Sequence, residues 1–244
     1  FKRLKGVSQT TLKYSFLLGI ALVVVYIGAT FGIKYTTLSN TGFLCGLSVI
    51  FTPVLSGIIY RKLPERKVML VVLMCLVGIG LLTMTDDFSI NFNNLKGDLL
   101  CIMCAFVYSI DLLLTERAVL REDVDPFQLG VFQLGVTGFL NLILSFIFEA
   151  PHLPGKEVLG PVLFLSIFCT GIAFIVQALA QKYTSASHVG IIFSLETLFV
   201  GLVAFIFAGE VLTFKSYIGA ALMIASIFIM EIDFSRVNCS EKID

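Results

Sequence analysis

The chain has 244 residues, of which 57% are hydrophobic and 14% are charged, with a formal net charge of zero. About a quarter of the residues of a typical soluble domain are charged, so this composition excludes a water-soluble globular protein and makes lipid the expected solvent. A neutral chain also lacks the basic face that nucleic-acid binding requires.

Eight apolar stretches follow one another along the chain, each close to the roughly 20 residues that a helix needs to cross a bilayer. They are Leu12–Ile33, Gly42–Tyr60, Val68–Met84, Asp98–Leu114, Phe127–Phe148, Leu159–Ala180, Val189–Ala208 and Tyr217–Ile232. Lipid cannot satisfy free backbone groups, so these stretches should be helical. The expected fold class is an all-α, polytopic transmembrane helix bundle.

Lysine and arginine are divided unequally between the two sets of connecting segments. The side that carries both termini holds 13 of these residues, including Arg61 and Arg66, whereas the other side holds 4, including Lys34. The positive-inside rule therefore predicts that both termini are cytoplasmic. We expect an integral protein of the plasma membrane.

A nine-residue string occurs twice, at Lys34–Gly42 and at Lys182–Gly190, with five identical positions and a constant offset of 148. Each copy joins two predicted spans, and the copies lie five spans apart. An odd number of crossings inverts the second copy relative to the first. Inverted repeats are the structural basis of many secondary transporters, in which a central site opens to the two sides in turn.

The two copies predict a duplicated domain organisation. The second copy, residues 96–233, contains five predicted spans, whereas the first, residues 1–85, contains three. We therefore expect eight of ten spans in a 5+5 inverted repeat, with two spans missing before Leu12. Residues 234–244 would form a cytoplasmic tail.

Several short strings carry a family resemblance: Gly32–Thr36, Gly97–Leu100, Ser194–Thr197 and Gly209–Thr213. In this order and spacing they resemble the EamA type of the drug/metabolite transporter superfamily, although Thr197 replaces the usual proline. The resemblance implies a ten-helix carrier with a central cavity. It also implies export or exchange of amino acids, amines or related metabolites without ATP hydrolysis, and no phosphate-binding G-x-x-x-x-G-K-[ST] string is present.

Ionisable side chains at membrane depth are costly, which makes them candidates for function. Glu196 is the deepest in its predicted span and could bind a coupling proton or a cationic substrate, or serve as a structural carboxylate. Asp111 could contact the substrate, or it could snorkel or pair with Arg117 near the cytoplasmic face. Coupling to a proton or another ion is therefore one role that these carboxylates could serve.

Uncharged and titratable polar residues complete the set of substrate or ion candidates: Asn40, His188, Tyr26, Tyr108 and Gln177. Asn40 and His188 occupy equivalent repeat positions and could instead belong to helix caps. Amides within spans, such as Gln177, more often bond between helices than contact a substrate. Pro53 is the candidate hinge, because proline frees a backbone carbonyl inside a helix.

Glycines within the predicted spans indicate where helix backbones approach closely. They are Gly78, Gly80, Gly130, Gly135 and Gly138.

Other classes of function find little support in the residue inventory. The chain has two histidines, and its C-x-x-C string, Cys101 to Cys104, lies in an apolar run without a second pair. We therefore expect no metal site, no cofactor, no catalytic residues and no enzyme activity. A non-transporting scaffold or accessory protein and a membrane-embedded lipid-modifying protein stay open as alternatives. The oligomeric state is not predicted.

Overall fold

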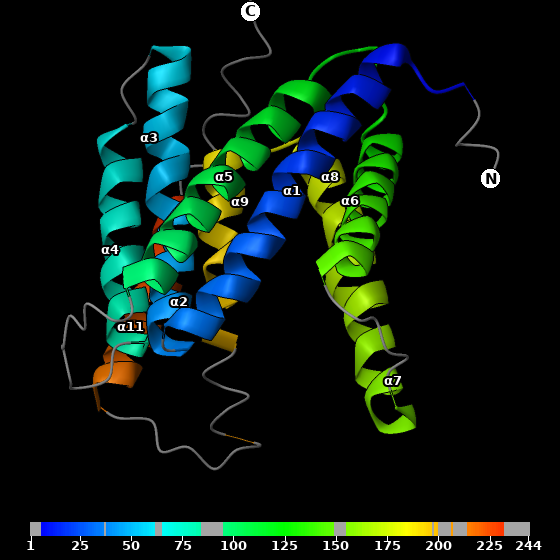
Figure 1. The fold of residues 1–244 in the computed structure, drawn as a ribbon. Helices are drawn as coiled ribbons and strands as arrows, with labels where there is room; N and C mark the ends of the chain where they lie inside the picture. The colour runs from blue at the N-terminus through cyan, green and yellow to red at the C-terminus, as the bar shows by residue number, and fades with distance from the viewer. Residues whose placement is uncertain are drawn as a thin grey trace, which may run out of the picture. The chain divides into compact units, whose positions relative to one another are not determined.

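A computed structural model of the chain describes residues 6–36, 38–61, 65–83, 95–148, 155–196, 198–199, 206 and 214–231. Within these ranges the regular structure is helical, without a strand (Figure 1). The helices are α1 (Gln9–Tyr35), α2 (Leu38–Gly46), α3 (Ser48–Tyr60), α4 (Arg66–Thr83), α5 (Leu95–Val119), α6 (Pro126–Phe148), α7 (Lys156–Phe164), the π-helix η3 (Leu165–Ile172), α8 (Ala173–Ala180), α9 (Ala186–Phe193) and α11 (Phe214–Glu231). The predicted all-α class is confirmed.

Five helical runs are long and apolar enough to cross a membrane. They are Gln9–Tyr35, Thr41–Tyr60, Leu95–Val119, Pro126–Phe148 and Glu157–Ala180. Each coincides with one of the predicted spans. The other three predicted spans overlap α4, α9 and α11, so the full count of eight stays a prediction.

The surfaces of these helices are apolar and exposed. Only 11% of the most apolar window is buried in both the α6 run and the Glu157–Ala180 run. Large side chains such as Phe146, Phe164 and Phe168 are exposed on them. Soluble proteins rarely expose such extensive apolar surface, which fits an integral membrane protein with lipid around these helices.

The chain forms two compact units, and each unit combines segments that are distant in the sequence. Unit 1 contains Phe1–Tyr26 and Ile110–Ala186, and unit 2 contains Ile27–Ser109 and Ser187–Asp244. The helices α1 and α5 therefore continue from one unit into the other. Each unit draws on both of the predicted repeats.

In unit 2, α4 and α11 pack along one another (Figure 1). Their contact depends on Gly78, where an added Cβ would lie 2.6 Å from Met223 Cγ and 2.9 Å from the Gly219 carbonyl oxygen. A Cβ on Gly80 would lie 3.3 Å from the Phe43 ring. The predicted close approach of helix backbones is thus confirmed at Gly78, whereas Gly80 packs against an aromatic side chain.

In unit 1, α6 packs on α8. A Cβ on Gly130 would lie 3.1 Å from Ile175 Cα, which confirms close packing at this glycine. In contrast, nothing in the described structure lies within 4 Å of a Cβ on Gly135 or Gly138. The prediction of close helix contact is wrong at these two positions, because their side of α6 has no protein neighbour there.

The helices α7 and α8 are joined by the π-helix η3. A π-helix has i→i+5 hydrogen bonds and therefore more residues in each turn than an α-helix, and it occurs frequently at functional sites. Residues of α7 and the first part of η3 are exposed, whereas α8 places Gln177 and Ala178 in the interior. No sequence pattern predicts this change of helix type.

Two short helices of unit 2 begin and end in a similar way. The first residues of α2 and α9, Leu38 and Ala186, are 148 positions apart, which is the offset of the repeated string. A single-residue turn follows each helix, at Leu47 and at Ser194. At both turns the backbone N–H donates to a carbonyl three residues earlier, at 3.2 Å.

Side chains of neighbouring helices bond at or beside both turns. The Ser109 hydroxyl of α5 donates to the Ser48 carbonyl at 3.2 Å, directly after the turn at Leu47. Cys75 Sγ of α4 lies 2.8 Å from Ser194 Oγ. The two interruptions are therefore built into the packing of unit 2.

Candidate functional site

Polar side chains are concentrated in the interior of unit 1. Its buried polar residues are Thr11, Ser15, Asp111, Thr115, Gln128, Gln133, Thr137, Gln177 and Gln181. Those of unit 2 are Thr41, Thr52, Ser109, Ser194 and Ser226, all of them hydroxyl residues. In the described part of the chain, the buried carboxylate and the buried carboxamides thus all belong to unit 1.

Asp111 is the charged member of this set and has an exposed fraction of 0%. Gln133 Nε2 of α6 donates to Asp111 Oδ1 at 3.2 Å, whereas Asp111 Oδ2 has no hydrogen-bond partner. Snorkelling or pairing with Arg117 is one role that the sequence predicts for Asp111. That role is wrong in this structure, because the side chain is fully buried and bonded to α6, while Arg117 is exposed.

Two further buried oxygen atoms, one on Thr115 and one on Gln181, lack partners among the described residues. Thr115 follows one turn later on α5, and its Oγ1 is unpaired among the described residues. Gln181 follows α8, and its Nε2 donates to the Leu112 carbonyl at 3.1 Å, whereas its Oε1 has no partner. The second half of α5 therefore carries, or lies beside, three unsatisfied oxygen atoms.

Tyr26 connects this region to the π-helix. Its hydroxyl interacts with the side chain of Thr170, a residue of η3, and it also interacts electrostatically with Asp111. Gln177 is buried in α8, four residues before Gln181 and hence on the same helical side. The structure thus gathers three predicted candidates, Tyr26, Asp111 and Gln177, in unit 1.

Three residues of this region were not proposed as site residues from the sequence: Gln133, Thr170 and Gln181. Gln133 is an amide within an apolar span, a position that favours a bond between helices, and its side chain bonds Asp111 of α5. Thr170 and Gln181 gave no comparable signal, because a hydroxyl in a membrane helix and an amide beside a turn are both ordinary.

The remaining candidates belong to unit 2. Glu196 is exposed and follows the turn at Ser194, and His188 is half-buried. Tyr108 stacks on Phe193, with ring centroids 6.3 Å apart. Pro53 is buried inside α3. The side chain of Asn40 lies outside the part of the chain that the structure describes.

No group of three or more possible metal ligands occurs among the described residues. Cys101 and Cys104 are free thiols buried in α5.

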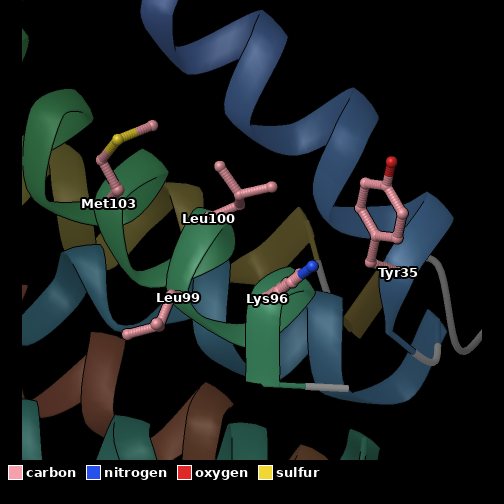
Figure 2. A pocket seen from close by; sticks show the side chains of 5 residues that line it. All are labelled: Tyr35, Lys96, Leu99, Leu100 and Met103. Carbon is pink, nitrogen blue, oxygen red and sulfur yellow. The ribbon is translucent and has the colours of Figure 1, made fainter. Parts of the chain in front are cut away.

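Unit 2 also contains an open groove of about 460 Å³ between the end of α1 and the beginning of α5. Figure 2 shows its lining residues, Tyr35, Lys96, Leu99, Leu100 and Met103. Leu99 and Met103 are exposed side chains, and no predicted site residue lines the groove. Its open, largely apolar wall fits an acyl chain better than a polar substrate.

Comparisons with known proteins agree with the sequence strings. Residues 95–232 match the EamA-like transporter family. An uncharacterized transporter of Methanothermobacter thermautotrophicus is 30% identical over 93% of this chain and 68% of its own length. One of Archaeoglobus fulgidus is 26% identical, over 90% of this chain and 69% of its own.

A solved crystal structure shares the fold. It aligns with a TM-score of 0.78 and 19% sequence identity, and covers 95% of this chain and 81% of its own.

Proposed function

Since this chain belongs to the EamA-like transporter family, we propose that it is a secondary transporter that moves a small metabolite by alternating access. One observation carries the proposal: an apolar, lipid-exposed helix bundle encloses a set of buried amides and a carboxylate in unit 1. Such groups are costly in a membrane unless they serve a polar ligand or one another. A scaffold protein has no need of a carboxylate that is only half satisfied.

The helix boundaries support the inverted repeat that alternating access requires. The helices α2 and α9 begin at the repeat offset and end in single-residue turns, at Leu47 and Ser194. Interrupted helices in corresponding positions of two halves are typical of the binding regions of secondary transporters. We therefore retain a 5+5 arrangement with repeats at 1–85 and 96–233, and the family match over 95–232 supports the second repeat.

Pro53 lies in α3, within two turns of the interruption at Leu47. We propose it as a hinge of the first repeat, because a proline removes a backbone hydrogen bond and weakens the helix locally.

The substrate class that we propose is an amino acid, an amine or a related metabolite, carried across the plasma membrane by a protein with cytoplasmic termini. Tyr26, Gln177 and the Asp111 region are the proposed contacts in unit 1. Glu196, His188, Tyr108 and Asn40 remain candidates in unit 2.

The test is counterflow of labelled amino acids and amines into liposomes that contain the purified protein. We expect at least one compound to exchange, and Tyr26→Phe to slow its uptake because the substitution removes the hydroxyl that interacts with Thr170. Tyr183→Phe is the matched control, because Tyr183 is 81% exposed, and it should leave uptake unchanged. If the folded protein exchanges none of the compounds, it is not the transporter proposed here, and the alternative of a non-transporting scaffold protein is favoured.

A further inference from the structure

The unsatisfied oxygen atoms of unit 1 indicate what the Asp111 region binds. Asp111 Oδ2, Thr115 Oγ1 and Gln181 Oε1 are buried acceptors without a donor in the described structure. Burying a carboxylate oxygen without a partner is unfavourable. The site therefore lacks a species that supplies positive charge or a donor hydrogen.

The burial of these oxygen atoms limits the size of the species that can bind to them. The exposed fractions of Asp111, Thr115 and Gln181 are 0%, 1% and 1%, so an ammonium group or a hydrated ion cannot reach them without rearrangement. Hard metal cations also need several oxygen ligands at once, whereas Asp111 Oδ1 already accepts the Gln133 amide hydrogen. A proton needs one lone pair and almost no volume.

Among the described residues, the groups recorded as acting on Asp111 include no cation. From α6 it meets the neutral amide of Gln133, and from α1 the ionisable group that interacts with it is the Tyr26 hydroxyl. Gln181, beside α8, is a neutral amide. On α5 itself the nearest charged side chains, Glu116 and Arg117, follow more than one turn later.

We propose that Asp111 is the site at which a proton binds and couples to transport, an inference that rests on the function proposed above. The proton comes from water on one side, bonds to a lone pair of Oδ2 and gives a neutral carboxylic acid, and it later returns to water on the other side. The neutral acid tolerates burial better than the charged carboxylate does. The charged carboxylate requires a conformation that is open to water.

The first experiment measures coupling in proteoliposomes. An imposed gradient of about one pH unit should drive roughly tenfold substrate accumulation for each coupled proton, with proton movement followed by an internal pH dye. Asp111→Asn should abolish the protons moved per substrate molecule, and Asp111→Glu should restore them in part. Asp98→Asn is the matched control, because Asp98 lies on the same helix and accepts a hydrogen bond from Thr36 at 2.6 Å. Its coupling should equal that of the wild type.

A second readout does not depend on transport. The infrared C=O band of a protonated carboxyl group at neutral pH should be present in the wild type and in Asp98→Asn, and absent in Asp111→Asn. The proposal is overturned if the band is still present in Asp111→Asn. Wild-type accumulation that follows a sodium gradient and not a pH gradient, or full proton coupling in Asp111→Asn, would also overturn it. If the wild type fails to exchange any compound yet shows the band, the proton site stands and the transport function fails.

Discussion

Substituting Gly78 with alanine tests the closest helix contact of unit 2. An alanine Cβ there would lie 2.6 Å from Met223 Cγ and 2.9 Å from the Gly219 carbonyl oxygen, whereas ordinary contacts begin at 3.4 Å. The methionine side chain can rotate away, but the backbone oxygen cannot. The α4 and α11 backbones must therefore separate, and overpacking of this kind costs about 1–3 kcal/mol.

The steric cost of Gly78→Ala must be separated from helix propensity, because alanine favours a helix over glycine by about 1 kcal/mol. Gly135→Ala supplies that reference, since a Cβ at Gly135 meets nothing within 4 Å. Both variants gain the same propensity, so the difference between them isolates the steric cost. We expect Gly78→Ala to be less stable than Gly135→Ala by about 1–3 kcal/mol.

Unfolding of the chain can be followed through the reactivity of its buried thiols. It has no tryptophan, but Cys75 and Cys104 are buried and free. In a background in which the exposed Cys169 and the half-buried Cys45 are replaced by serine, a fluorogenic maleimide should react with the buried thiols only as the protein unfolds on heating. The reasoning is refuted if Gly78→Ala unfolds at the same temperature as Gly135→Ala, because α4 and α11 then cannot be as close as described.

Three further substitutions follow from the packing and the topology. Gly32→Ala should destabilise the protein, because its Cβ would lie 2.5 Å from Cys101 Sγ while its other neighbours are at 3.6 Å or beyond; Cys101→Ala should relieve the clash in the double variant, and additive melting-temperature losses would contradict this. Gln133→Leu should lower stability by about 0.6–1.7 kcal/mol, the range of interhelical hydrogen bonds in membranes, as measured by the same thermal assay. Single cysteines at Lys34 and Lys182 should react with an impermeant maleimide from opposite sides of the membrane, and labelling from one side would exclude the inverted repeat.

The membrane spans were largely predictable from the sequence, because lipid demands long apolar helices. The predicted span Phe127–Phe148 differs from α6 by one residue at its start, and Leu159–Ala180 ends where α8 ends. The same apolar composition gives no information about which side of each helix faces the interior of the protein. A helix that is apolar all round gives no amphipathic signal, so the lack of neighbours at Gly135 and the full burial of Asp111 required three-dimensional packing.

The candidate site was predictable only as separate residues. Asp111 and Tyr26 stood out as polar groups in apolar helices, but no local pattern joins them to one another or to Thr170. Long-range proximity depends on how the chain divides into its two units, and that division crosses α1 and α5 in the middle of each helix. Glu196 had the strongest depth argument in the sequence, yet its side chain, two residues after the turn at Ser194, is exposed.

The π-helix η3 sets how far α7 is rotated about the helix axis relative to α8. If Leu165–Ile172 wound as an ordinary α-helix, each of its residues would advance the helix by about 100°, more than in the wider π-helix, and α7 would rotate relative to α8. With α7 held in place, Gln177 and the surface that meets Gly130 would turn away from α6. The rotation of α7 relative to α8 therefore depends on the eight residues of η3. Relatives in which this stretch is an ordinary α-helix should show a one-residue gap there when their sequences are aligned with this chain.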